Sequence, residues 1–246
     1  MSIDTGSLDT PVGPHGDEPH DDSISSRLNW LRAGVLGGND GIVSTAGLVM
    51  GVAGATSDRT TILIAGIAGV AAGALSMAAG EYVSVSTQRD SERAILAKER
   101  AELRDEPEEE LAELAGLYVQ KGLSEPLALQ VAEALTAHDA LAAHAETELG
   151  IDPDDLTNPW HAAWASMLAF MLGALLPLLT ITLTPPTIRV GATVAAVGVA
   201  LALTGWVSAR LGYGAVRRAV ARNVGGGVLA MAVTYWIGAL IGTQIG

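Results

Sequence analysis

Residues 61–104 read TILIAGIAGVAAGALSMAAGEYVSVSTQRDSERAILAKERAELR, and the organisation of the rest of the chain follows from them. The first half of this stretch is apolar apart from Glu81, and its second half is charged. No proline interrupts it, and no glycine follows Gly80. At about 1.5 Å per residue such a helix is a rod of roughly 65 Å, and about half of that length is enough to cross a bilayer. The stretch therefore predicts one helix that starts inside a membrane and ends well outside it.

The composition is typical of a membrane protein with segregated charge. The chain has 246 residues, 49% of them hydrophobic, and a formal net charge of −13. Of its 27 acidic residues, 18 lie between Asp90 and Asp155 and six lie in the first 26 positions, which leaves Asp40, Asp58 and Glu81. Cysteine is absent, so oxygen, imidazole and thioether groups are the ligands that remain for a metal.

We expect an all-α membrane protein with five transmembrane helices and a three-helix acidic domain inserted between spans 2 and 3. Residues 1–26 are acidic and rich in Gly, Pro and Ser, which predicts a disordered tail. Spans 1 and 2 lie in residues 27–89, the acidic domain in 90–158 and spans 3–5 in 159–246. The expected spans are about 33–56, 61–85, 160–184, 188–209 and 223–245. The acidic helices are expected at the end of the long rod, at 107–121 and at 125–149.

The distribution of Lys and Arg predicts the orientation. With the N-terminus in the cytoplasm, only Arg59 and Arg189 of the 14 basic residues fall in loops on the far side. Cytoplasmic loops of membrane proteins carry an excess of basic residues. We therefore expect a multi-pass protein of the cell (inner or plasma) membrane, with the N-terminus and the acidic domain in the cytoplasm.

Asp40 and Glu81 are the carboxylates within the apolar spans. A carboxylate is costly in a bilayer unless it is paired or protonated, so each is a functional candidate. These spans contain no Lys or Arg to pair with them, and a cation or a proton is the natural partner. Ser44 follows Asp40 by four residues, and Met77 precedes Glu81 by four, so each shares a helix face with its carboxylate. A thioether beside carboxylates favours a divalent transition ion over Ca²⁺ or Mg²⁺. An interfacial position for Glu81 and a packing role for Met77 are the competing interpretations.

Paired candidate ligands recur on the three expected acidic helices. Glutamates spaced i, i+3 occur on the first two helices, and a histidine and a glutamate spaced i, i+4 occur on the third. Such pairs could surround one or more divalent ions, and a solvated acidic face is the competing interpretation. The Glu-x-x-His spacing of ferritin-type di-iron oxidases does not occur. The candidate ligands are Glu99, Glu102, Glu110, Glu113, His144 and Glu148.

The chain resembles the vacuolar iron transporter family from about Leu28 to its C-terminus. Four sequence features carry the resemblance: Asn39-Asp40-Gly41 leading into GVAGA at 51–55, AGALSMAAGEY at 72–82, the Glu-x-x-Glu pairs, and TELG at 147–150. The resemblance implies a homodimer of five-span protomers that exchanges cytosolic Fe²⁺, or related ions such as Mn²⁺, for protons. It also implies an ion pathway between the protomers, lined by the first two spans.

By motif position, Asp40 and Met77 match the family's pathway residues. Five of the acidic-domain glutamates match those of the family's metal-binding domain: Glu99, Glu102, Glu110, Glu113 and Glu148. Two departures stand out. Plant members carry a glutamate eight residues before the methionine, where this chain has Gly69, and Glu81 is the candidate to replace it. Where plant members have a methionine pair this chain has His144 and Ala145, and an imidazole would change the metal preference.

We therefore predict a transporter that exports Fe²⁺ or Mn²⁺ from the cytosol in exchange for protons, with no resident cofactor. Glu and His ligands do not separate the two ions decisively. The alternative is a membrane-anchored metal buffer or sensor without transport, for which Asp40 has no role. An enzyme is not indicated, because the sequence shows no nucleophile–base pair and no phosphate-binding loop. It also shows no basic surface for nucleic acid.

Overall fold

The computed structural model of the chain describes residues 23–154, 156–212 and 214–245, with side chains from residue 34 to residue 243. Most of the predicted tail lies outside the described residues, and the first helix already begins at Ser23, so the last four residues of that tail are helical. The described residues form helices and connecting loops without strands, which confirms the all-α class. The elements are α1 (Ser23–Ala55), α2 (Arg59–Asp105), α3 (Pro107–Gln120), α4 (Glu125–His144), a π-helical turn (Ala145–Leu149), α5 (Pro159–Leu183), α6 (Arg189–Leu211) and α7 (Val216–Ile245).

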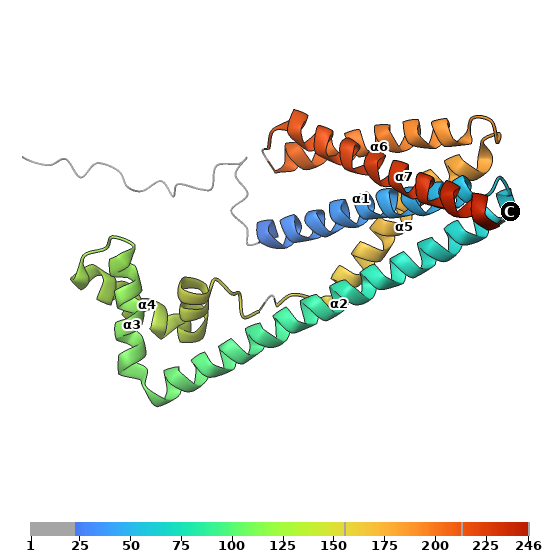
Figure 1. The fold of residues 1–246 in the computed structure, drawn as a ribbon. Helices are drawn as coiled ribbons and strands as arrows, with labels where there is room; N and C mark the ends of the chain where they lie inside the picture. The colour runs from blue at the N-terminus through green and yellow to red at the C-terminus, as the bar shows by residue number, and fades with distance from the viewer. Residues whose placement is uncertain (1–22, 155, 213, 246) are drawn as a thin grey trace, which may run out of the picture.

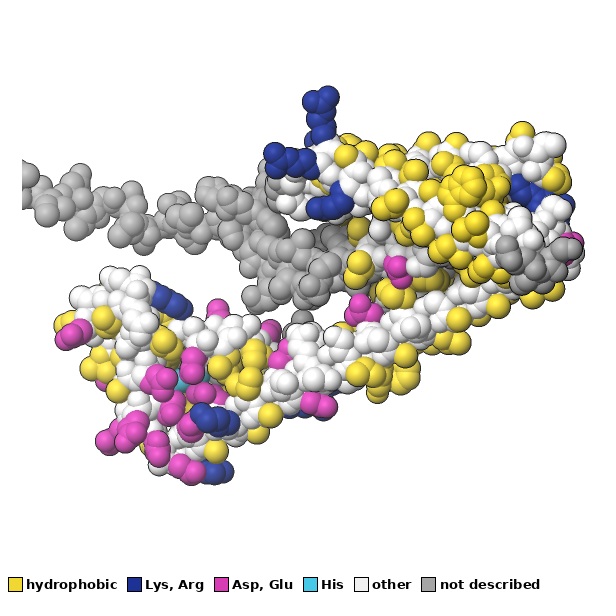
Figure 2. All heavy atoms as spheres, viewed as in Figure 1, with side chains coloured by type: hydrophobic (Ala, Val, Ile, Leu, Met, Phe, Trp, Pro, Cys, Tyr) yellow, Lys and Arg dark blue, Asp and Glu magenta, His cyan; other side chains and the backbone are white. Residues whose placement is uncertain are grey.

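Five of these helices are long and apolar enough to cross a membrane, as predicted: α1 from Gly34, α2, α5, α6 and α7. Figure 1 shows α1, α5, α6 and α7 side by side in a bundle, from which α2 extends to α3 and α4. Hydrophobic side chains cover the bundle, and acidic side chains gather at the far end of α2 (Figure 2). The polar end of the molecule is thus well separated from its apolar body.

Helix α2 is the continuous rod that the sequence predicts, 47 residues long. Asp58 caps its start, with Oδ2 accepting hydrogen bonds from the backbone N–H of Thr61 at 2.7 Å and from the Thr61 hydroxyl at 2.6 Å. Pro107 begins α3 directly after α2, because proline favours the first turn of a helix and cannot continue one. One rigid element therefore joins the apolar bundle to the acidic domain.

Helix α1 is packed deeply in the bundle, against α5 along its first half and against α7 along its second. Glycines bring the backbones together, as is common between helices in lipid. A Cβ on Gly238 of α7, for example, would lie 1.8 Å from the carbonyl oxygen of Gly51. The buried core around α1 consists of Ile42, Ala46, Val49, Met50, Ile62, Leu178, Ile181, Val197, Leu201 and Met231. This packing fixes the position of α1 and of the residues that it carries.

The acidic domain has a small core of Leu114, Ala132 and Ala143. The single helix predicted over 125–149 is wrong in detail, because the chain bends at Asp139 and then forms the π-helical turn. Asp139 has extended backbone angles (φ −157°, ψ 99°), and its Oδ1 accepts a hydrogen bond from the Ala142 N–H at 2.9 Å. An aspartate that caps a helix start in this way favours an interruption.

Candidate functional site

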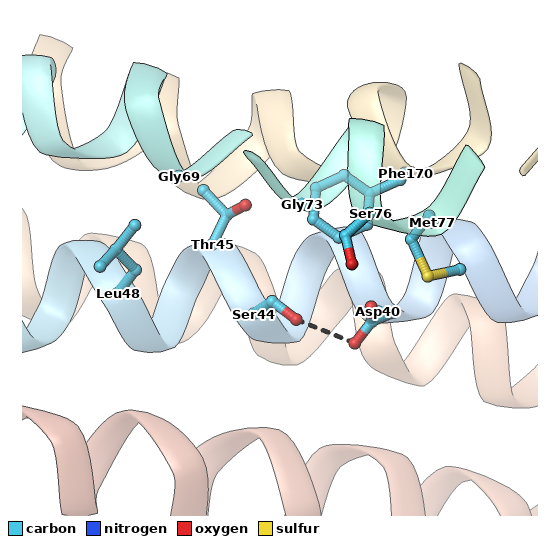
Figure 3. A pocket seen from close by; sticks show the side chains of 9 residues that line it. All are labelled: Asp40, Ser44, Thr45, Leu48, Gly69, Gly73, Ser76, Met77 and Phe170. Carbon is cyan, nitrogen blue, oxygen red and sulfur yellow. Dashed lines mark hydrogen bonds between the residues drawn. The ribbon is translucent and has the colours of Figure 1, made fainter. Parts of the chain in front are cut away.

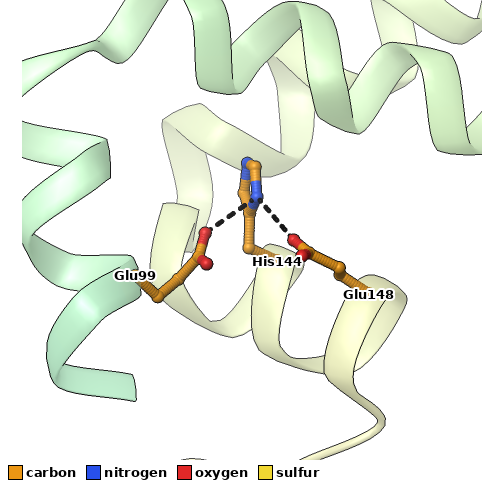
Figure 4. Close-up of side chains that lie close together, drawn as sticks. All are labelled: Glu99, His144 and Glu148. Carbon is orange, nitrogen blue, oxygen red and sulfur yellow. Dashed lines mark ion pairs between the residues drawn. The ribbon is translucent and has the colours of Figure 1, made fainter. Parts of the chain in front are cut away.

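A cluster of four candidate ligands lies inside the acidic domain, where α2, α3 and the end of α4 meet. The Nδ1 atom of His144 lies 3.0 Å from Glu99 Oε1, 3.6 Å from Glu110 Oε2 and 3.9 Å from Glu148 Oε2. Figure 4 shows Glu99 and Glu148 approaching the imidazole from opposite sides. We call Glu99, Glu110, His144 and Glu148 the acidic-domain cluster. Residues from four consecutive elements thus converge on one point.

Three members of the cluster are buried while Glu148 is exposed at its edge, and several of the buried polar atoms have no hydrogen-bond partner in the protein. The His144 side chain is 0% exposed, and Glu99 and Glu110 are buried as well. The two ring nitrogens of His144 and Oε1 of Glu99 make no hydrogen bond of good geometry. Unsatisfied buried polar atoms are rare because each costs about 1–3 kcal/mol. Ligand atoms of Glu99, His144 and Glu148 lie within 4.8 Å of one another, close enough to hold one metal ion.

Burial, with a smaller contribution from neighbouring carboxylates, raises the pKa of two carboxyl groups of the cluster. Burial raises the pKa of Glu99, with a smaller opposing effect from His144 and a further increase from Glu148 and Glu110. Burial also raises the pKa of Glu110, with Glu113 adding to the shift. These directions follow from removing charged groups from water and placing like charges together. A divalent cation among the carboxylates would relieve both penalties.

Local irregularities place His144 and Glu148. The bend at Asp139 starts a new helical segment, and His144 ends it. The π-helical turn follows at once, and turns of this kind occur often at functional sites. It ends at Gly150, whose φ of +63° is the left-handed conformation that glycine adopts readily. The hydroxyls of Tyr118 on α3 and Thr147 in the turn lie 3.2 Å apart, which ties the turn to α3.

Two of the six predicted acidic-domain ligands lie at the edge of the cluster. Glu102 is partly exposed and pairs with Lys98 at 2.7 Å. Glu113 is exposed on α3, near enough to Glu110 to raise its pKa. Each Glu-x-x-Glu pair therefore contributes one buried and one peripheral carboxylate. Glu102 and Glu113 are suited to attract cations toward the cluster, because exposed charges raise the local concentration of counter-ions. They are less suited to hold an ion, because exposed ion pairs are weak.

Asp40 and Met77 line a cavity of about 210 Å³ between α1 and α2. The Ser44 hydroxyl donates a hydrogen bond to Asp40 Oδ1 at 2.8 Å, as the i, i+4 spacing suggested (Figure 3). Ser76 points from α2 toward α1 in the same view. The complete lining is Asp40, Ser44, Thr45, Leu48, Gly69, Gly73, Ser76, Met77 and Phe170. The cavity thus offers carboxylate, hydroxyl and thioether groups within an apolar wall.

Glu81 does not line this cavity. It lies on α2 one turn beyond Met77 and is half-buried. Gly69 does line it, and the position holds no ligand. A Cβ at Gly69 would lie 2.0 Å from Leu48 Cδ2, so the Leu48 side chain occupies the space that a longer residue at 69 would need. Glu81 is therefore the nearest carboxylate to Asp40's cavity along α2.

Sequence reasoning missed Thr45, Ser76 and Phe170 as lining residues. Ser76 directly precedes Met77, and its hydroxyl in an apolar span was an available signal. Thr45 follows Ser44 and is 2% exposed. Phe170 lies on α5, far away in the sequence, and nothing in its local pattern connects it to α1 or α2. Only the packing of α5 between these helices brings it to the cavity.

Comparison with known proteins identifies the family. A sequence model of the VIT family matches residues 31–239. The chain is 42% identical to the vacuolar iron transporter of Acanthamoeba castellanii over 224 residues, which are 91% of this chain and 82% of that protein. It is 39% identical to vacuolar iron transporter homolog 1 of Arabidopsis thaliana over 221 residues, 89% of this chain and 87% of the relative. These matches confirm the resemblance drawn from the motifs, and the chain belongs to the VIT family.

Proposed function

We propose that the protein transports Fe²⁺ or Mn²⁺ out of the cytosol in exchange for protons. The observation that carries this proposal is the placement of two ligand groups on one helix. Helix α2 contributes Met77 to the cavity that contains Asp40, and it contributes Glu99 to the acidic-domain cluster. Membership in the VIT family supports metal transport, because relatives are named iron transporters.

The acidic-domain cluster is suited to collect the ion. Its three carboxylates and one imidazole are ligands for divalent transition metals. Burial strengthens the electrostatic attraction of Glu99 and Glu110 for a cation relative to exposed carboxylates. Glu102 and Glu113 at the edge would raise the local concentration of cations. We propose that the ion enters here and is then released toward the membrane along α2.

The cavity between α1 and α2 is suited to pass the ion through the bilayer. Asp40 supplies the negative charge, and Met77 supplies a polarisable sulfur that favours transition metals over Ca²⁺ and Mg²⁺. The hydrogen bond from Ser44 holds one carboxylate oxygen of Asp40 and leaves the other free for the ion. Protonation of Asp40 would remove most of this attraction. Glu81, one turn past Met77, is the proposed second proton acceptor.

A second copy of the chain would complete the pathway. Ser44 and Ser76, which line the cavity, are exposed on the single protomer. Exposed polar groups at membrane depth are costly unless protein or water covers them. We propose a homodimer in which this face of α1 and α2 meets the partner. The cytoplasmic orientation of the N-terminus and the placement in the cell membrane remain predictions, and the relatives' names refer to a vacuole instead.

A membrane-anchored metal buffer or sensor is the second candidate. The burial of Glu99, Glu110 and His144, well away from the bundle, is the observation that favours it. This candidate assigns no role to the cavity around Asp40. The two functions therefore differ in what they predict for a change at Asp40.

Uptake into sealed proteoliposomes distinguishes them. The full chain is reconstituted, Fe²⁺ (under anaerobic conditions) or Mn²⁺ is added outside, and the ion inside is measured over time. Asp40→Asn should abolish uptake, and Asp90→Asn, at an exposed position on α2 outside the apolar part, should not. Binding of the ion without uptake by the wild-type protein would support the buffer or sensor. Ion uptake by Asp40→Asn at the rate of the wild-type protein would refute the proposed pathway.

A further inference from the structure

Phe170 is the single phenylalanine of the chain, and it lies between the two helices that form the cavity. It belongs to α5 and is 2% exposed. Its neighbours on either side are glycines, Gly41 on α1 and Gly73 on α2. Figure 3 shows its ring beside Gly73, on the α2 side of the cavity.

The two glycines contact different parts of Phe170. A Cβ on Gly41 would lie 2.1 Å from the carbonyl oxygen of Phe170 and 2.9 Å from its carbonyl carbon. A Cβ on Gly73 would instead lie 2.3 Å from Cζ of the ring and 2.7 Å from Cε1. The backbone of α5 therefore touches α1 at Gly41, while the ring of Phe170 touches α2 at Gly73.

These contacts lie next to the proposed ion ligands. Asp40 directly precedes Gly41, and Met77 lies one helical turn after Gly73. Because α5 meets α1 by its backbone, the ring of Phe170 limits how closely α2 can approach that pair of helices beside Asp40.

We propose that Phe170 is a positioning residue that sets the separation of α1 and α2 at the ion pathway. The expected effect on ion transport rests on the proposed function, whereas the effect of Phe170 on the helix separation does not. The competing explanation is ordinary packing, since Phe170 also contacts Ala74, Ala174 and Met167 in a small apolar cluster. A pure packing role predicts a loss of stability without a specific relation to Gly73.

The test uses the difference between the two glycine contacts. Gly73→Ala should push α2 away through the ring and raise the KM for the ion by about tenfold or more, since misplacing a ligand by about 1 Å can cost 100-fold. Phe170→Leu removes Cζ and both Cε atoms, so Gly73→Ala/Phe170→Leu should recover a KM near that of Phe170→Leu alone. Gly41→Ala should not be rescued by Phe170→Leu, because its clash is with backbone. Gly191→Ala on α6, with open space around its Cβ, is the control.

A second measurement tests the geometry without transport. The chain has no cysteine, so Ser44→Cys and Ser76→Cys can be introduced together, one on each helix. Mass spectrometry of the monomer band, after treatment with bifunctional thiol reagents of increasing length, then reports the separation of α1 and α2 within one protomer of the reconstituted protein. Gly73→Ala should shift efficient cross-linking to longer reagents, and adding Phe170→Leu should reverse the shift.

The outcomes separate this inference from the proposed function. An altered cross-linking length that Phe170→Leu restores supports the positioning role even if no variant transports ions. The positioning role would be overturned if Gly73→Ala left the cross-linking length unchanged. It would also be overturned if Phe170→Leu rescued Gly41→Ala as fully as it rescues Gly73→Ala. A KM in Gly73→Ala equal to that of Gly191→Ala would overturn it as well. If the wild-type protein takes up no ion but the variants show the predicted cross-linking, the proposed transport function is refuted and the positioning role of Phe170 is not.

Discussion

Replacing Glu99 with glutamine tests the acidic-domain cluster by an effect of opposite sign with and without metal. Glu99 is buried, its Oε1 lies 3.0 Å from Nδ1 of His144, and burial raises its carboxyl pKa. Glutamine has nearly the same size without the charge. In the metal-free protein Glu99→Gln should therefore be at least as stable as the wild type, because an amide is cheaper to bury than a carboxylate among carboxylates.

With metal present the same variant should lose stability relative to the wild type. Removal even of a supporting group around a metal site costs about 10–100-fold in affinity, and a direct ligand should cost at least as much. At a metal concentration of about 100 times Kd, binding stabilises the folded state by about 2.7 kcal/mol. A hundredfold rise in Kd at that concentration would reduce the stabilisation to about 0.4 kcal/mol.

Thermal unfolding of the detergent-solubilised full chain measures both effects, with EDTA in one series and Mn²⁺ or anaerobic Fe²⁺ in the other. Glu133→Gln, at an exposed position on α4 away from the cluster, is the matched control and should keep the wild-type metal response. A metal-dependent increase in Tm in Glu99→Gln equal to that of the wild type would refute the assignment of Glu99 as a ligand.

Three further predictions concern the same domain. Because burial raises the carboxyl pKa of Glu110, the folded metal-free protein binds a proton at this carboxyl more tightly than the unfolded chain does. The stability of the metal-free protein should therefore fall as the pH rises from about 4.5, the ordinary pKa of a glutamate, toward neutrality. Glu110→Gln should make this fall less steep in thermal unfolding with EDTA. Tyr118→Phe removes the hydrogen bond to Thr147, worth about 1 kcal/mol, and should lower the Mn²⁺ affinity about fivefold in a calorimetric titration. Thr147→Val removes the same hydrogen bond, so the double variant should lose no more affinity than either single variant. Gly150→Ala should destabilise the protein by about 1–2 kcal/mol in thermal unfolding because its φ is +63°, whereas Gly116→Ala, in α3 with open space at its Cβ, should stabilise it slightly.

The helices could be predicted from the sequence because their signals are local and strong. Apolar runs of more than 18 residues predict spans, and the helix expected to start at Pro107 does so in the structure. The bend at Asp139 was not predicted. Its side chain caps the next segment, and an aspartate in an amphipathic stretch is equally compatible with a continuous helix facing water.

The candidate ligands could be predicted as pairs, but the buried member of each pair could not. Residues at i and i+3 lie on nearly the same helix face, so spacing alone does not separate Glu99 from Glu102 or Glu110 from Glu113. The choice depends on how α2, α3 and the end of α4 pack, which sets the burial of each carboxylate. Phe170 shows the same limit in the bundle, because its place in the cavity arises from contact between helices distant in sequence.

Simultaneous measurement of ion and proton movement shows whether the protein exchanges the metal ion for protons through Asp40. Sealed proteoliposomes containing a pH-sensitive dye, with an imposed pH gradient that is acidic inside, receive anaerobic Fe²⁺ outside, and the ion inside is measured at the same time. We expect ion uptake accompanied by proton efflux in a fixed ratio, and we expect Asp40→Asn to lose both. Ion uptake with no change in proton flux, or coupled exchange that persists in Asp40→Asn, would contradict proton exchange through Asp40.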